Sequence, residues 1–152
     1  MCLARALSDA DASGKVITFD VLPHDVGILW NCVRDADGPC SRAELLADYA
    51  DLVERYVVFV RGDTRRELAR TCFPRVHAAF LDSVHTYAHV MAEFDCIRAG
   101  QKAGDILFFD DYTAAAYPGV VKAADEICAT AGYAKTVVEA HAGRRYLIAV
   151  KE

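Results

Sequence analysis

The apolar positions of this chain follow two different periods, and their order predicts strands that alternate with helices. Short runs rich in β-branched and aromatic residues predict buried strands, whereas apolar residues spaced by three and four positions predict helices. The predicted strands are residues 15–21, 56–63, 75–82, 104–111, 134–140 and 144–151. The predicted helices are residues 3–10, 41–56, 64–73, 86–100 and 119–132.

The residues that flank these runs support the predicted boundaries. Ser41 with Glu44 three residues later forms the pattern of a capping box, which predicts a helix start at this point. Gly100 and Gly132 follow the last apolar positions of two helices, where glycine commonly ends a helix. Residues 22–40 form a long connection, and a loop of this length is often functional. Trp30 in that loop is a candidate for a lid or for the wall of an acceptor pocket, or it simply covers the core.

Strands that alternate with helices favour an α/β fold in which most strands are parallel. We therefore predict a Rossmann-like, mostly parallel sheet with helices on both faces and an antiparallel hairpin at the C-terminus. A chain of 152 residues is about one domain long. The sequence contains no repeat and no linker, so residues 1–152 are predicted to form a single domain.

Composition and charge argue against nucleic acids and anionic membranes as binding partners. The net charge is −5, the pI is near 5.5, and 54% of the residues are hydrophobic. An acidic chain without a lysine or arginine cluster is a poor match for nucleic acid or for an anionic membrane. The sequence has neither a membrane-length apolar run nor a signal peptide, so we expect a soluble cytoplasmic protein. The six scattered cysteines are expected to be reduced, although Cys32 and Cys40 are worth testing for oxidation.

Acidic residues stand where four of the predicted strands end. They are Asp20, Asp63, Asp82, Asp110 and Asp111. Parallel strands direct their carboxyl ends to one edge of the sheet, and ligands bind at that edge in open α/β folds. Asp20 could accept hydrogen bonds from both hydroxyls of a ribose, or it could be an ordinary turn residue.

Asp82, Asp110 and Asp111 follow two strands that we expect to be neighbours in the sheet. Three hard oxygen donors at one edge would suit Mg²⁺ or a similar divalent cation; alternatively Asp111 caps a turn and faces water. His85 is a candidate general base or nucleoside contact. With His89 it also has the spacing of a zinc pair on a helix, but the glutamate of the common zinc motif is missing. A phosphoryl-transfer enzyme is a weaker reading, since no glycine-rich phosphate loop is present.

Five segments of the sequence together resemble the class I S-adenosylmethionine-dependent methyltransferases. They are VITFDVLPHD, YVVFVRGDT, FLDSVHTYAHVMAEFDCI, AGDILFFDDYTAAAYPGVVKAADEI and YLIAVK. The likeness is greatest to the small-molecule O-methyltransferases of the methyltransferase-24 type, which are related to the macrocin and catechol O-methyltransferases. The pair of motifs Asp-x-x-His-x-Tyr and Gly-Asp-x-x-x-Phe-Asp-Asp-Tyr carries most of the resemblance.

The resemblance implies a role for each candidate residue. The implied cofactor is S-adenosylmethionine, and its binding residues would be Asp20, Gly62, Asp63, Asp82 and His85. Asp82, Asp110 and Asp111 would be the ligands of a divalent cation such as Mg²⁺. His85 would be the catalytic residue, and the acceptor would be a small molecule that offers a hydroxyl group. Tyr87 and Tyr112 would serve packing more than chemistry.

The resemblance also implies that the first strand and the glycine-rich loop of the family lie before residue 1. We therefore expect the sheet to lack that strand. Three explanations stay open, namely a fragment, a strand supplied by a partner chain in a homo-oligomer or strand-swapped dimer, and a domain that no longer binds cofactor. The last of these would make the chain a remnant α/β domain that acts as a binding or dimerisation module.

Overall fold

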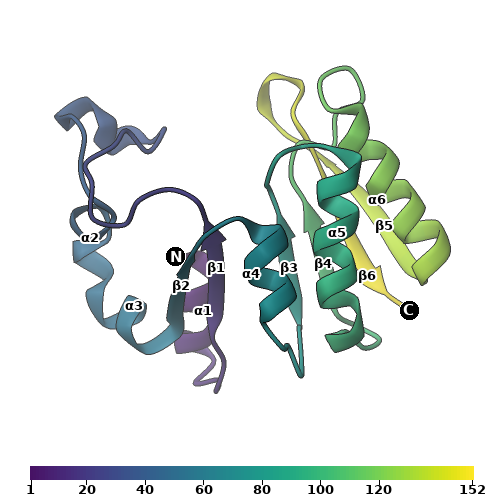
Figure 1. Ribbon diagram of the computed structural model, residues 1–152, viewed down its shortest axis with the longest axis horizontal. Helices are drawn as coiled ribbons and strands as arrows, with labels where there is room; N and C mark the ends of the chain where they lie inside the picture. The colour runs from purple at the N-terminus through teal and green to yellow at the C-terminus, as the bar shows by residue number, and fades with distance from the viewer. The chain divides into compact units, whose positions relative to one another are not determined.

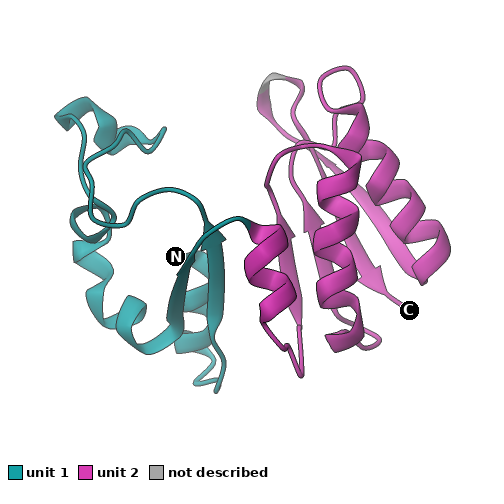
Figure 2. Ribbon diagram, in the orientation of Figure 1, with its two compact units in different colours: residues 1–63 teal, residues 64–152 magenta. Residues whose placement is uncertain are grey.

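The computed structural model describes every residue of the chain except Ala142. The chain divides into two compact units, residues 1–63 and residues 64–152, which Figure 2 distinguishes by colour. The prediction of a single domain over residues 1–152 stays a prediction.

Unit 1 contains one parallel pair of strands. β1 (Val16–Asp20) pairs with β2 (Val57–Arg61), so that Asp20 lies opposite Arg61 at the carboxyl ends of both strands. The helical elements of this unit are α1 (Cys2–Asp9), η1 (Val33–Asp37), α2 (Arg42–Leu45), η2 (Ala47–Tyr49) and α3 (Ala50–Tyr56). The parallel pairing confirms the prediction for these two strands (Figure 1).

The prediction of one continuous helix over residues 41–56 is wrong. The capping box is present, because the Ser41 hydroxyl accepts a hydrogen bond from the Glu44 amide and the Glu44 carboxylate accepts one from the Ser41 amide. The helical path is then interrupted at Leu46 and again at Tyr49, where ψ is 10° and 18° in place of the value near −42° of an α-helix. The apolar spacing continues across these two breaks, which is why periodicity alone did not reveal them.

Unit 2 contains a four-stranded sheet with the order β3-β4-β6-β5. Its strands are β3 (Ala78–Leu81), β4 (Ile106–Phe109), β5 (Tyr133–Glu139) and β6 (Arg145–Lys151). Its helical elements are α4 (Thr64–Arg70), α5 (Tyr87–Ile97), η3 (Arg98–Gly100), α6 (Pro118–Ala131) and η4 (His141–Gly143). β3 and β4 are parallel, whereas β6 runs antiparallel to both β4 and β5, which confirms the predicted C-terminal hairpin. Among the described residues, no helix is long and apolar enough to cross a membrane.

The core of unit 2 lies between its sheet and the helices α5 and α6. Figure 1 shows both helices in front of the sheet, with α4 beside α5. Leu107 and Phe109 of β4 and Leu147 of β6 are completely buried beneath them. Ala123 and Ala124 of α6 are also completely buried, and their small side chains allow the helix to lie close to the sheet.

The opposite face of the same sheet carries a row of aromatic side chains. Phe80, Phe108 and Tyr146 come from three adjacent strands, and their ring centroids are 5.2 and 5.4 Å apart along the row. Phe80 is 53% exposed. Because successive residues of a strand point to opposite faces, these aromatic residues alternate with the buried residues of the core.

The third strand begins later than the predicted residue 75. Arg75 precedes it and pairs with the buried carboxylate of Asp105, while its guanidinium also donates to the carbonyl oxygens of Val76 and Gly100. These contacts tie the loop before β3 to the loop before β4. Backbone hydrogen bonds from the Val76 amide to Gly100 and from the Ile106 amide to His77 hold the same segment, so the Arg75 side chain adds to backbone pairing before the strand begins.

Candidate active site

The carboxyl ends of β3 and β4 place three of the predicted acids in one region of unit 2. The two strands are parallel and pair Leu81 with Phe109, so Asp82 and Asp110 leave the sheet at neighbouring positions. The Asp110 amide still donates to the Leu81 carbonyl oxygen, which continues the ladder by one residue. Asp111 follows directly. The side chains differ in exposure, at 42% for Asp82, 10% for Asp110 and 15% for Asp111.

His85 connects the two strand ends. Its Nε2 atom lies 3.3 Å from Oδ1 of Asp82 and 3.2 Å from Oδ2 of Asp111. A carboxylate can only accept a hydrogen bond, so the nitrogen that faces both carboxylates is the one that carries a hydrogen. The imidazole ring also lies against the ring of Tyr117, with a centroid distance of 4.6 Å. The residue is therefore fixed on two sides.

A second positive group, Arg144, lies at the start of the last hairpin strand. Its Nη2 atom is 3.1 and 3.2 Å from the two carboxylate oxygens of Asp110. The same nitrogen is 3.4 Å from Oδ1 of Asp111. One nitrogen therefore bridges two carboxylates, and the guanidinium also lies over the ring of Tyr146 at 5.5 Å.

The backbone around this cluster is strained at two residues. His85 has a φ of 49° and Asp111 a φ of 52°, both in the left-handed region that residues other than glycine seldom occupy. A residue held there costs about 1–3 kcal/mol, and such residues concentrate in active sites and ligand clamps. The two strained residues are also the two that contact each other through Nε2 and Oδ2.

Gly119 allows the start of α6 to lie close to the His85 turn. A Cβ atom at this position would come within 2.7 Å of the Tyr87 amide nitrogen and 3.2 Å of the Thr86 backbone. Only glycine fits at such a distance from another backbone. The α6 helix begins just after Tyr117, so this close approach also holds the Tyr117 ring beside His85.

The charges of the cluster act on each other. Burial raises the pKa of the Asp82 carboxyl, the negative charge of Asp110 raises it further, and the hydrogen bond from His85 opposes both effects. The pKa of the Arg144 guanidinium is also raised, chiefly by the charge of Asp110. Negative charge is therefore in excess around Asp82, while Arg144 compensates it at Asp110.

Asp20 and Gly62 lie together in unit 1, at the ends of β1 and β2. The Gly62 amide donates to the Asp20 carbonyl oxygen at 2.9 Å. The Asp20 side chain accepts a hydrogen bond from the Leu22 amide, which is the geometry of an Asx turn. Asp63, the third predicted cofactor residue of this unit, ends the same segment. The turn role of Asp20 is thus present, and its predicted ribose role stays a prediction.

A buried arginine holds the second oxygen of Asp20. Nη2 of Arg42 lies 3.4 Å from Oδ2 of Asp20, and the Arg42 residue is only 8% exposed. Its guanidinium lies 5.3 Å from the ring centre of Trp30 and 4.8 Å from that of Phe59. Cation–π contacts of this kind stabilise a guanidinium away from water. The buried Arg42 side chain therefore holds the Asp20 carboxylate in position.

The loop over residues 22–40 is held by its own hydrogen bonds. Trp30 donates from its indole nitrogen to the Cys40 carbonyl oxygen and from its amide to Asp35. Ile28 and Cys40 form an isolated antiparallel bridge. Cys32 is exposed and Cys40 is buried, and both are free thiols. Trp30 covers Arg42 in this arrangement, and its predicted role as a lid or pocket wall stays a prediction.

Tyr87 and Tyr112 serve the packing role expected of them. The hydroxyl of Tyr87 donates to Glu126 and that of Tyr112 donates to Asp125, so both tyrosines are anchored to α6. His89, the second histidine of the alternative zinc pair, lies 3.2 Å from the Thr86 hydroxyl through its Nδ1 atom. Among the described residues, no group of three or more His, Cys, Asp or Glu side chains is close enough together to hold a metal ion.

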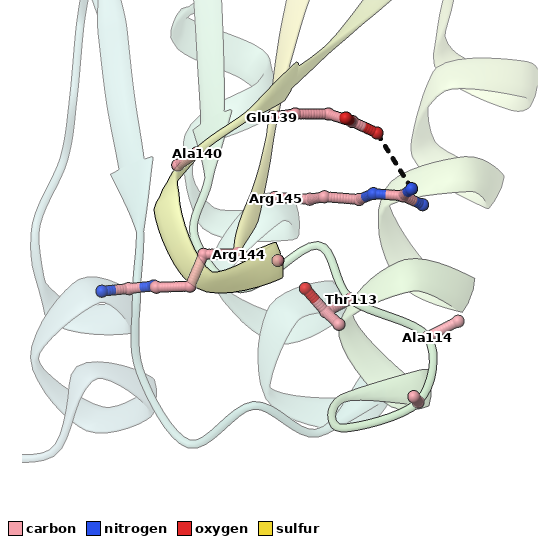
Figure 3. A pocket seen from close by; sticks show the side chains of 8 residues that line it. Thr113, Ala114, Glu139, Ala140, Arg144 and Arg145 are labelled. Atoms are coloured by element: carbon pink, nitrogen blue, oxygen red, sulfur yellow. Dashed lines mark hydrogen bonds and ion pairs between the residues drawn. The ribbon is translucent and has the colours of Figure 1, made fainter.

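A shallow pocket of about 250 Å³ lies beside this cluster. Figure 3 shows it between the loop after β4 and the β5–β6 hairpin, where Thr113, Ala114, Glu139, Ala140 and Arg145 line it. Arg145 and Glu139 form an ion pair of 2.9 Å across one side. The Arg144 side chain leaves the hairpin in the direction opposite to this ion pair (Figure 3).

The sequence did not indicate that Arg42 and Arg144 contact the acids at the strand ends. In the sequence Arg144 was notable only as part of the basic pair Arg144-Arg145. The signal that could have identified Arg144 is the antiparallel direction of the last strand, because the start of β6 must then lie beside the end of β4. Arg42 offered no signal, since its position after an N-cap is typical of an exposed residue.

Comparison with known proteins agrees with this geometry. A family model described as a methyltransferase domain, Methyltransf_24, matches residues 1–112. A search of the curated proteins finds no match to this sequence.

Several solved structures share the fold. The O-methyltransferase NovP superimposes with a TM-score of 0.69 at 15% identity, over 98% of this chain and 65% of NovP. TomG from Streptomyces achromogenes, solved with S-adenosylmethionine, gives a TM-score of 0.64 at 16% identity, over 99% of this chain and 66% of TomG. An O-methyltransferase from Bacillus cereus in complex with SAH gives 0.61 at 17% identity, over 98% and 67% of the two chains.

The chain thus spans about two thirds of the length of these structures, including 65% of NovP. At such low identity the likeness to them concerns the fold, whereas the family model matches the sequence itself over most of the chain. By this match the chain belongs to the methyltransferase-domain family Methyltransf_24.

Proposed function

We propose that this chain carries part of the catalytic site of an S-adenosylmethionine-dependent O-methyltransferase that acts on a hydroxyl group of a small molecule. The observation that carries the proposal is the family match over residues 1–112. NovP and the Bacillus cereus protein are both described as O-methyltransferases, and their similar fold supports this type of reaction. The cofactors in the TomG and Bacillus cereus structures support the choice of methyl donor.

The reaction requires a hydroxyl oxygen to attack the methyl carbon of the sulfonium group. A C–O bond forms, the C–S bond breaks, and the hydroxyl proton must leave for the neutral ether to result. Catalysis then depends on holding the two reactants in line and on removing that proton. A base close to the acceptor would remove that proton.

His85 is the proposed base. Its Nε2 atom faces Asp82 and Asp111 and so carries a hydrogen, which leaves Nδ1 as the nitrogen able to accept a proton. The two carboxylates would stabilise the positive charge that forms on the ring when Nδ1 takes the proton. Carboxylates orient catalytic histidines in the same manner in hydrolase triads.

The proposed cofactor residues are Asp20, Gly62, Asp63, Asp82 and His85. Asp20 is the residue that would accept hydrogen bonds from the ribose hydroxyls. Its carboxylate already receives one hydrogen bond at each oxygen, from Leu22 and from Arg42. A carboxylate offers about four acceptor positions in total, so both oxygens can still accept a hydrogen bond from the cofactor.

The chemistry of the three acids suits a divalent cation, although their present arrangement does not. Asp82, Asp110 and Asp111 are hard oxygen donors from rigid strand ends, which Mg²⁺ prefers. Arg144 occupies the oxygens of Asp110, and His85 stands between Asp82 and Asp111. The assignment of these three acids as the residues that would hold a divalent cation is a proposal supported by their chemistry alone. A bound cation would lower the pKa of the acceptor hydroxyl.

A titration and an activity assay test the proposal on the full chain. Calorimetry with SAH should detect binding, and radiolabelled S-adenosylmethionine should transfer its methyl group to a phenol, a catechol or a sugar hydroxyl. His85→Gln should lower the methyl-transfer rate by about 10²–10⁴-fold, the usual contribution of a general base. His89→Gln is the matched control, since His89 bonds to Thr86 outside the cluster, and it should leave the rate unchanged.

The rival function is a binding or dimerisation module without catalysis. It would give a stable oligomer that releases no heat on addition of SAH and transfers no methyl group, and this result would reject the proposed enzyme. A homo-oligomer that does bind SAH would instead fit an enzyme assembled from several chains. The cytoplasmic location stays a prediction.

A further inference from the structure

Tyr117 covers one face of the proposed base. Its ring centroid lies 4.6 Å from that of His85, and the two ring planes are inclined at 35°. Nε2 of the same imidazole faces the carboxylates of Asp82 and Asp111, at 3.3 and 3.2 Å. The histidine is therefore held at one nitrogen by two acids and across one ring face by a tyrosine.

The backbone holds Tyr117 on both sides. Its amide donates to the Thr113 carbonyl oxygen at 2.7 Å, and its own carbonyl oxygen accepts a hydrogen bond from the Val120 amide at the start of α6. Pro118 begins that helix, where the fixed φ of proline favours the helical path. The Tyr117 side chain is half-buried and packs against the core of unit 2. The fold itself therefore places this ring, independently of the histidine that the ring contacts.

The Tyr117 ring restricts the rotation of the imidazole. The bond that carries an imidazole ring has broad, two-fold torsional minima, so a histidine can exchange the two edges of its ring by a half-turn. Such a half-turn would move Nε2 of His85 away from the carboxylates and would bring Nδ1 to the opposite edge. A flat ring sweeps through the space over its own faces when it turns, and Tyr117 fills that space on one side.

We infer that Tyr117 is a positioning residue for His85, and that its ring keeps Nδ1 on the edge where this nitrogen can take the proton of the acceptor. The inference rests on the proposed function, because it takes His85 as the base. The contact is made by the ring and not by the hydroxyl of Tyr117. Phenylalanine should therefore serve equally well at this position, whereas leucine, which has no flat ring, should leave the imidazole free to turn.

The orientation of the imidazole is tested without any substrate, by nitrogen NMR of the full chain with isotope-labelled histidine. At alkaline pH the ring of the parent chain should carry its hydrogen on Nε2, because that nitrogen faces two carboxylates. Tyr117→Phe should give the same tautomer. Tyr117→Leu should shift both nitrogen signals towards the average of the two tautomers. His85→Gln identifies the signals of His85 by their loss.

The consequence for the reaction is tested with radiolabelled S-adenosylmethionine and the acceptor that the parent chain methylates among catechol, phenol and glucose. Tyr117→Leu should lower kcat about three- to tenfold, the shift expected from the loss of one aromatic pair, and should leave the KM for S-adenosylmethionine unchanged. Tyr117→Phe should restore the parent kcat. Tyr87→Leu is the matched control, because this tyrosine packs on α6 through Glu126 and Lys122, and it should lower stability without lowering kcat.

A folded Tyr117→Leu variant that keeps the single Nε2–H tautomer would overturn the inference, whatever its rate, and so would a Tyr117→Phe variant that behaves like Tyr117→Leu. Circular dichroism confirms that each variant is folded, and Tyr117→Met replaces the leucine variant if that chain does not fold. Methyl transfer by the parent chain with no effect of Tyr117→Leu on the tautomer rejects only the role of Tyr117. A changed tautomer in a parent chain that transfers no methyl group supports the hold on His85 and counts against the methyltransferase.

Discussion

Each unit has an acid at the end of a parallel strand that pairs with an arginine. The two pairs, Asp20 with Arg42 and Asp110 with Arg144, differ in the surroundings of the arginine. In unit 1 the Arg42 side chain is 10% exposed and lies against two aromatic rings beside Asp20. In unit 2 the Arg144 side chain is 52% exposed and lies over one ring beside Asp110. The same acid–arginine pairing therefore places the guanidinium away from water in unit 1 and leaves it largely in water in unit 2, where the acid alone is buried.

A third pair, Arg75 with Asp105, extends the comparison to an acid at the base of β4. Asp105 is 4% exposed and accepts hydrogen bonds from both Arg75 and the Lys102 amide. Replacement by alanine should lower the free energy of unfolding by about 3 kcal/mol, because loss of one partner leaves the other buried and unpaired. Urea unfolding of the Asp105→Ala variant measures this loss, and a change below about 0.5 kcal/mol would contradict it.

The pH dependence of this pair has a definite sign. The hydrogen bond from Arg75 holds the pKa of the Asp105 carboxyl below its usual value. A lowered folded-state pKa adds stability above the unfolded-state pKa of about 3.9 and loses it as the pH falls through the folded-state value. The stability difference between the parent chain and Asp105→Asn should therefore be largest near neutral pH and should shrink in acid. A difference that grows in acid would contradict the assignment.

The second largest effect is expected for Arg42. Arg42→Ala removes the ion pair to Asp20 and the contacts with two rings, and it should lower the stability of unit 1 by about 2 kcal/mol. Hydrogen exchange of the loop over residues 22–40 should increase in the same variant. Arg34→Ala is the control, since Arg34 forms an exposed pair with Asp37 and should change stability by less than about 0.5 kcal/mol.

The smallest effect is expected for Asp82, and it has the opposite direction. Burial and the charge of Asp110 raise the pKa of Asp82, so its ionised form is disfavoured in the folded chain. A raised pKa of an acid means that this cost is absent below the unfolded-state pKa and complete above the folded-state pKa. Asp82→Asn should therefore stabilise the chain slightly near neutral pH, by less than about 0.5 kcal/mol because solvent screens a side chain that is 42% exposed, and the gain should vanish below about pH 4. Thermal unfolding across this pH range measures it, and a loss of stability at neutral pH would contradict it.

Much of the fold could be predicted because strand ends and helix ends carry local signals. Gly132 follows the end of α6 as predicted, with a φ of 70°, and Ser41 forms the predicted capping box. The breaks at Leu46 and Tyr49 were missed because the apolar spacing that packs α2 and α3 continues through them. Apolar periodicity indicates which side of a segment is buried. It does not indicate the backbone angles of the residues that lie between the apolar positions.

The sequence placed the acids at the strand ends together, whereas it did not indicate the arginine that pairs with them. Asp82, Asp110 and Asp111 could be placed because parallel strands direct their carboxyl ends to one edge. Arg144 joins them from β6, far along the chain, and its position depends on the strand order β3-β4-β6-β5. Sequence spacing gives strand direction more readily than strand order, so residues that reach a site from a non-consecutive strand were overlooked.

The left-handed backbone at His85 and Asp111 limits which amino acids these positions can accept. Glycine fits there without strain, and Asn, Asp and His occupy this conformation several times more often than other residues. Of these four residue types, Asn, Asp and His carry side chains that can bind a proton or form hydrogen bonds. Saturation mutagenesis at either position should accordingly yield folded protein for only a few amino acids. Variants with a β-branched residue should fail to accumulate as folded protein, so their catalytic activity could not be assayed.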